Sequence, residues 1–194
     1  MKTELYGWPV NENDLEGFSP FESPAHRGVE ALANACDFIV SIGTEVLAMA
    51  SGRVIYIRQD SKRGGNDFPE CGDIRNSRYW EGGNRIEICH GREIYTGYEH
   101  LGFNSSLVAE GENVEKGQPI AVTGYTGLMA HLGPHLHVER MVYTGKGNED
   151  YWFLPLQFEN EVLLFTKYLW DSEKWREIGN SRQITYEKSV DKKC

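Results

Sequence analysis

The chain has 194 residues, of which 40% are apolar and 12% aromatic, a composition that supports a hydrophobic core and argues against disorder. Its formal net charge of −9 repels a phosphate backbone, so we expect no nucleic-acid partner. It contains no run of 18 apolar residues, so we expect no membrane span.

Short β-strands are the dominant pattern, after an irregular lead-in over residues 1–25 that is rich in Pro, Gly, Asn and Glu. Apolar stretches at 45–50 and 53–58 flank Ser51-Gly52, which predicts two strands joined as a hairpin or a bend. A second hairpin is predicted from 85–90 and 93–101. The later β segments are a turn feeding a strand at 113–124 and an alternating strand at 135–143.

Two segments depart from this pattern. Residues 59–84 are polar, Gly-rich and too long for an ordinary connection, so they form either a flexible loop or a groove wall that presents Arg75, Tyr79 and Trp80. Residues 159–178 carry apolar side chains at helical spacing before Gly179, which predicts a helix and then a polar tail to residue 194. The expected fold is therefore mostly β, with a C-terminal helical appendage over 159–194.

The stretch GPHLHVER places His135 and His137 one residue apart on a predicted strand. Alternate side chains of a strand point the same way, so both imidazoles lie on one face. They are either two surface histidines or part of a metal site. A catalytic zinc takes three protein ligands and keeps a fourth position for water. The groups that could complete such a site are His26, Glu30, Asp37 and His100, the last on the same face as Tyr98.

Several segments occur in an order that resembles the lysostaphin-type zinc metallopeptidases of the M23 family. They are DFIVSIGTEVLAMASGRV, GGNRIEICHGREIYTGYEHL, VAEGENVEKGQPIAVTGYTG and GPHLHVER, and the resemblance covers residues 26–158. It implies an antiparallel β-sheet or sandwich with the site in an open groove. It also implies a hydrolase that cuts peptide bonds in cell-wall peptidoglycan. By the same resemblance the zinc ligands are His26, Asp37 and His137, and the uncoordinated catalytic histidines are His100 and His135.

The spacing of the first two ligands departs from the pattern of many family members, in which a His and an Asp lie four residues apart. Here that spacing falls on Glu30, whereas Asp37 lies eleven residues after His26. Asp37 is followed by Phe and lies six residues before Gly43, which is the register that the family's acid keeps with its Gly-Thr turn. Asp37 is therefore the preferred ligand and Glu30 the alternative.

The other candidate residues receive structural roles. His90 is predicted to support the fold, and His131 to lie in a solvated loop. Cys36 and Cys89 should point to the strand face opposite the site. His100 and His135 divide two tasks between them: one accepts a proton from water and passes it to the leaving amine, and the other stabilises the developing charge. The sequence leaves open which residue does which.

Two other classes of function compete with the peptidase. A family member that no longer hydrolyses could bind zinc as a regulator or a cell-wall binding module, although all five expected positions are filled here. The stretch GENVEKGQPIAVTG also resembles lipoyl- or biotin-carrier domains, and sugar-phosphotransferase carriers pair two histidines. Against these carriers, no Met-Lys-Met-like site lies near a turn, and Asp37 would repel a phosphate.

The N-terminal segment has no apolar leader. We therefore expect a protein that stays in the cytoplasm, leaves by another route or lacks its signal in this sequence. The family resemblance implies a substrate outside the cytoplasm.

Overall fold

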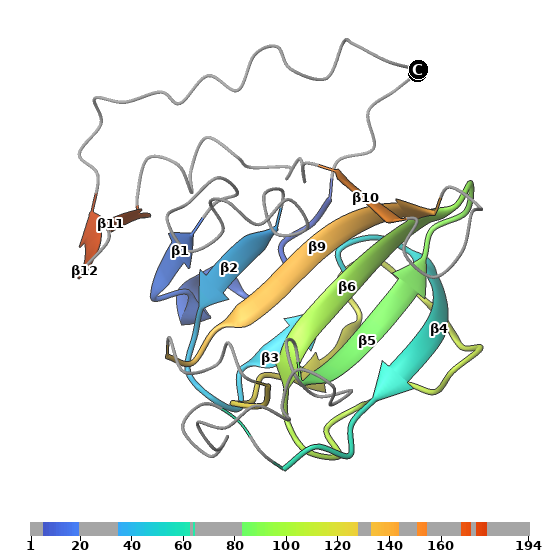
Figure 1. Cartoon of the computed structure of the whole chain (residues 1–194), viewed down its shortest axis with the longest axis horizontal. Helices are drawn as coiled ribbons and strands as arrows, with labels where there is room; N and C mark the ends of the chain where they lie inside the picture. The colour runs from blue at the N-terminus through green and yellow to red at the C-terminus, as the bar shows by residue number, and fades with distance from the viewer. Residues whose placement is uncertain are drawn as a thin grey trace, which may run out of the picture.

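The structure is a computed structural model that describes residues 6–19, 35–62, 64, 83–127, 133–143, 151–154, 168–171 and 174–177. Within these ranges an eight-stranded antiparallel sheet has the order β1-β2-β9-β6-β5-β4-β7, and β10 pairs with β9 (Figure 1). Its strands are β1 (Gly17–Ser19), β2 (Cys36–Ile39), β4 (Gly52–Arg58), β5 (Asn84–Cys89), β6 (Ile94–Leu101), β7 (Asn113–Val114), β9 (Leu136–Tyr143) and β10 (Tyr151–Leu154). The prediction of a mostly antiparallel β fold is confirmed.

A two-stranded sheet made of β3 (Glu45–Leu47) and β8 (Pro119–Val122) lies behind the large sheet in Figure 1. The connection around Ser51-Gly52 is thus a bend, because β3 pairs with β8 while β4 pairs with β5 and β7. The segment 113–124 contains a turn that leads into β8, as its sequence predicts, and the short strand β7 before the turn, which was not predicted.

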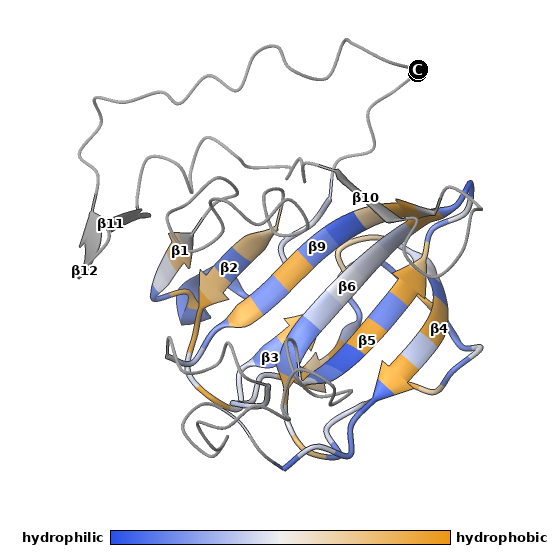
Figure 2. Ribbon diagram, in the orientation of Figure 1, coloured by the Kyte–Doolittle hydropathy of each residue, from blue (hydrophilic) through white to orange (hydrophobic). Residues whose placement is uncertain are grey.

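The core lies between the two sheets. Alternation along β5 buries every second residue, and β5 and β9 change between blue and orange along their length in Figure 2. The buried cluster combines residues of the large sheet with Val46 and Ile120 of the small one. From the large sheet it contains Phe38, Val54, Ile86, Ile88, Tyr98, Leu136 and Val138. Each such side chain contributes roughly 1.5–3 kcal/mol by its removal from water.

Tyr98 spans this core. Its hydroxyl accepts a hydrogen bond from the Met49 amide at 2.8 Å, and burial raises its pKa to about 12. The phenol therefore joins β6 to the segment after β3. Tyr98 is a core residue and not part of the polar face.

The lead-in is more ordered than its composition predicts. It contains the 3-10 helix η1 (Glu12–Asp14) and β1, which pairs with β2. Tyr6, Val10 and Phe18 are buried in the core. These apolar residues stand singly among turn-forming residues, so they form no periodic hydrophobic pattern in the sequence.

The prediction of a helix over 159–178 is wrong for the residues that the structure describes there. β11 (Tyr168–Asp171) and β12 (Lys174–Glu177) form an antiparallel hairpin in which Trp170 is opposite Trp175. Aromatic residues favour strands, and this preference outweighs the helical spacing of the apolar residues. Residues 159–167 and the tail lie outside the described ranges, as do 65–82 of the long loop with Arg75, Tyr79 and Trp80.

Candidate active site

Asp37 and His137 form the centre of a polar site on the face of the large sheet opposite the core. They are register partners on β2 and β9, and each is only 5% exposed. The His137 Nδ1–H donates to Asp37 Oδ1 at 2.7 Å. Burial lowers the pKa of His137, but the hydrogen bond and the charge of Asp37 outweigh it and raise the pKa to about 9. The imidazole and the carboxylate are therefore joined by a charge-assisted hydrogen bond.

His135 lies one residue before β9 and points to the same face as His137. Its Nδ1 is 2.7 Å from the Gly133 carbonyl oxygen. A carbonyl can only accept, so Nδ1 carries the hydrogen and a neutral His135 has its lone pair on Nε2. That Nε2 lies 4.0 Å from Asp37 Oδ1. The ring is therefore oriented with its acceptor nitrogen toward the carboxylate.

His100 reaches the site through a β-bulge. Arg85 is opposite Glu99 while Asn84 is opposite Leu101, so His100 is the extra residue of β6. Its φ of 61° is left-handed, which is uncommon for a residue other than Gly. Simple alternation predicts the face of Tyr98 for His100, and that prediction is wrong because the bulge re-aims the side chain.

The His100 ring stacks edge-on against its two neighbours. Its centroid is 4.4 Å from that of His135 and 6.1 Å from that of His137. The Nδ1 donates to the Thr126 carbonyl at 2.7 Å, so the lone pair of the neutral ring is again on Nε2. Burial, followed by the nearby His135, lowers the pKa of His100 to about 3. His100 is therefore neutral at working pH.

The donor types at this site suit a zinc ion. Imidazole nitrogen and carboxylate oxygen are ordinary zinc ligands, and His137 and Asp37 supply one of each. Among the described residues no group of three His, Cys, Asp or Glu side chains is arranged to hold a metal. The third predicted ligand, His26, and the alternative carboxylate, Glu30, both lie outside the described residues.

Beside the site lies a set of ion pairs that the sequence reasoning missed. The Arg85 cluster consists of Arg85, Glu87, Glu99 and Glu139, with side chains 5–18% exposed. Arg85 donates to Glu87 at 2.7 Å, to Glu139 at 2.6 Å and to Glu99. The signal in the sequence was the presence of charged residues within three strand segments, RIE, YEH and VER. Their partners only become apparent once the strand pairing is known.

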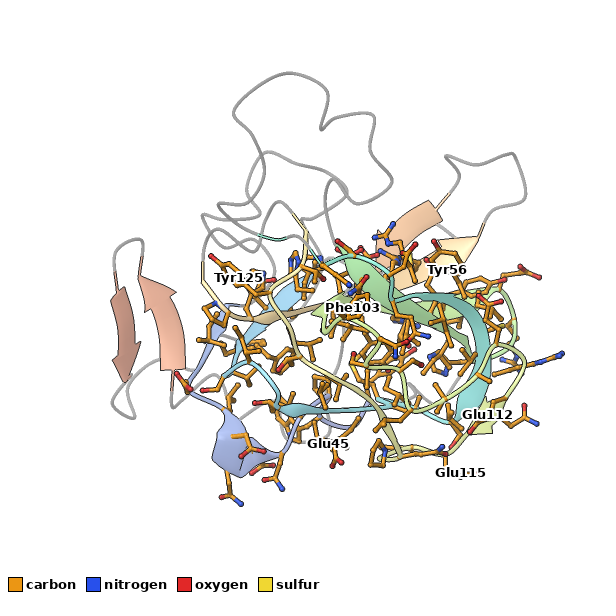
Figure 3. All side chains as sticks on the ribbon, turned by 90° about the horizontal axis from the view of Figure 1, so that it is seen from below. Glu45, Tyr56, Phe103, Glu112, Glu115 and Tyr125 are labelled. Atoms are coloured by element: carbon orange, nitrogen blue, oxygen red, sulfur yellow. The ribbon has the colours of Figure 1, made fainter. Side chains whose placement is uncertain are left out.

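The two sides of the fold differ in the residues they carry. Tyr56 is the register partner of Glu87, so it belongs to the face of the Arg85 cluster. In Figure 3 Tyr56, Phe103 and Tyr125 lie along the upper side, whereas Glu45, Glu112 and Glu115 lie along the lower side. The lower side is that of β3, β7 and β8.

The remaining candidate residues that the structure describes have structural roles. His90 bridges the Ser51 carbonyl at 2.9 Å and Thr96 Oγ1 at 2.8 Å, as a fold-supporting residue would. Cys36 is buried in the core, and Cys89 is a half-buried free thiol. His131 lies outside the described residues. Within the described ranges, no helix has the length and hydropathy that a membrane crossing needs.

Similar sequences are known. A metalloprotease of Haemophilus influenzae without assigned function is 38% identical over 114 residues, which is 59% of this chain and 18% of that protein. The peptidoglycan DD-endopeptidase ShyB of Vibrio cholerae is 32% identical over 126 residues, which is 65% of this chain and 24% of that protein. The chain thus spans about a fifth of the length of the curated relatives that it matches.

Fold and family comparisons agree with these matches. A chain of the SpoIIQ–SpoIIIAH pore-forming complex has a TM-score of 0.52, covering 82% of this chain and 96% of that chain. At 16% identity this similarity shows a shared fold only. The family model described as peptidase family M23 matches residues 31–149. Because that match spans more than half of the chain, the protein belongs to peptidase family M23.

Proposed function

We propose that the protein is a zinc-dependent endopeptidase that hydrolyses peptide bonds in peptidoglycan stem peptides or cross-bridges. The observation that carries the proposal is the convergence of Asp37, His100, His135 and His137 on one face of the sheet. The names of the relatives, a metalloprotease and a peptidoglycan DD-endopeptidase, support the reaction class and the substrate.

The proposed zinc ligands are His26, Asp37 and His137. When bound, the ion lowers the pKa of a water to about 7 and polarises the scissile carbonyl. Asp37 lies against His137 on a neighbouring strand, which supports the choice of these two side chains as ligands. His26 stays a prediction from the sequence.

The geometry supports a division of labour between the two other histidines. The Nδ1–H of His100 donates to the Thr126 carbonyl, which leaves Nε2 as an acceptor toward the site, so we assign His100 the removal of the proton from the attacking water. His135 Nε2 lies 4.0 Å from the Asp37 carboxylate, so a proton on that nitrogen is close to a negative charge. We assign His135 the stabilisation of the oxyanion, while His100 passes the proton that it takes from the water to the leaving amine.

Digestion of purified peptidoglycans that differ in cross-bridge chemistry tests this proposal. Fragments are identified by mass, with and without a chelator and with zinc restored. We expect cleavage that the chelator abolishes, and a loss of about 10²-fold or more in rate for His137→Ala. His90→Gln, which removes an imidazole outside the site, is the matched control and should retain activity.

Variants of the two acids decide the carboxylate ligand. Asp37→Ala should lose both zinc and activity, and Glu30→Ala should keep them. The reverse result would move the ligand to Glu30. Stoichiometric zinc binding without cleavage of any peptidoglycan would contradict the enzyme and favour a zinc-binding regulator.

A further inference from the structure

All three nitrogens of the Arg85 guanidinium form ion pairs within the sheet. Its Nε contacts Glu87 at 2.7 Å, its Nη2 contacts Glu139 at 2.6 Å and its Nη1 contacts Glu99. The three carboxylates come from β5, β9 and β6, so one cation is shared by three strands. The Arg85 cluster as a whole places three carboxyl groups around one guanidinium.

This cluster is adjacent to the proposed metal ligands. In the strand register, Glu99 lies between Arg85 and His137, and His137 is opposite Asp37. Glu139 follows His137 by two positions and so shares its face. Two additional carboxylates therefore lie on the same face as the site, Glu139 on the strand that carries His137 and Glu99 on the neighbouring strand.

Gly97 lets the guanidinium reach across β6. It is opposite both Glu87 and Glu139 in the register. A Cβ at Gly97 would lie 2.8 Å from Arg85 Nη2 and 3.1 Å from Glu139 Cγ. The absence of a side chain at this position leaves the space through which Arg85 pairs with Glu139.

We propose that Arg85 is a positioning residue that holds Glu99 and Glu139 as its own ion-pair partners, so that neither becomes a ligand of the metal at Asp37 and His137. The proposal rests on the zinc site proposed above. An additional carboxylate ligand would occupy the position that a catalytic zinc must leave open for water. Fixing both acids on a protein cation keeps that position accessible.

The proposal has a consequence that a purely structural ion pair does not share. The guanidinium fills the space among three carboxylates. Its removal would leave a cluster of oxygen ligands in which a metal cation could take its place. Such clusters bind hard divalent ions, and calcium takes oxygen ligands in flexible geometry. Calcium is therefore a probe that distinguishes this cluster from the nitrogen-containing site at His137.

The test is thermal unfolding of Arg85→Met with and without calcium, together with calcium titration by calorimetry. We expect calcium in hundredfold excess over its Kd to raise the melting temperature of Arg85→Met by roughly 5 °C or more and to leave that of the wild type unchanged. Arg85→Lys, which keeps a cation, should show no calcium effect. The triple variant Arg85→Met/Glu99→Gln/Glu139→Gln should also show none.

Two results would overturn the proposal. One is an Arg85→Met protein that folds and melts identically with and without calcium. The other is an Arg85→Met protein that does not fold even with calcium present, because the proposal requires an ion to replace the guanidinium. Absence of zinc from the wild-type protein would contradict the proposed function and, with it, the role of Arg85 toward the metal. The calcium response of Arg85→Met is measured without zinc, so a failure of the cluster itself is distinguished from a failure of the proposed function.

Discussion

The hydrogen bond between His137 and Asp37 gives the metal-free protein a distinctive pH dependence. The pKa of His137 is about 9 in the folded state against 6.5 in the unfolded chain, so folding retains a proton that unfolding releases between these values. The resulting stabilisation is complete below pH 6.5 and is lost as the pH rises through 9. We expect this group to reduce the free energy of unfolding by about 3 kcal/mol over that range.

Urea unfolding of the metal-free protein at neutral and alkaline pH measures this loss. Asp37→Asn removes the charge that raises the pKa of His137 and should flatten the dependence. His90→Gln, which changes a histidine away from Asp37, should leave the pH dependence of the free energy of unfolding unchanged. If Asp37→Asn kept the pH dependence of the wild type, the Asp37 carboxylate would not be the cause of the raised pKa of His137.

At the scale of elements, the end of β6 depends on a close approach to the segment after β8. The Gly124 amide donates to the His100 carbonyl at 2.8 Å. A Cβ at Gly124 would lie 2.6 Å from the Gly102 backbone, which cannot move aside as a flexible side chain can. We expect Gly124→Ala to cost about 1–3 kcal/mol of unfolding free energy and to lower activity by displacing His100.

Gly43→Ala is the comparison for this variant. Gly43 has a φ of +89°, and a Cβ at this position would meet no atom within 4 Å. Alanine there therefore costs about 1 kcal/mol of backbone strain without a clash. Urea denaturation and peptidoglycan cleavage are measured for both variants. A Gly124→Ala protein with wild-type stability would show that the two segments can separate freely.

Local sequence patterns predicted the positions of the strands better than they predicted which strands and side chains pair with one another. Alternation was enough to place β4, β5, β6 and β9, because each has one buried face. The residue types at 37, 100, 135 and 137 were likewise available from the motifs. The pairing of β3 with β8 and the ion pair between Arg85 and Glu139 join residues far apart in the chain, so no local pattern encodes them. The bulge at His100 requires a left-handed histidine, which has no sequence signature.

At the scale of the whole molecule, stability and chemistry lie on opposite faces of one sheet, and β9 displays both. Leu136 and Val138 are fully buried in the core, whereas His135 and His137 face the polar site. An alanine scan along β9 should therefore alternate in its effects. Leu136→Ala should cost about 2–5 kcal/mol of unfolding free energy by leaving a cavity. His135→Ala should abolish cleavage of peptidoglycan while the protein remains folded.

The scan is read by urea unfolding and by cleavage measured on the same preparations. His137→Ala loses its bond to Asp37 as well as its chemistry, so its stability should fall in metal-free protein by less than that of Leu136→Ala. Val138→Ala should lose stability and keep the activity of whatever fraction is folded. If His135→Ala unfolded as readily as Leu136→Ala, the polar face would be part of the core that stabilises the fold, and the separation of the two faces would be wrong.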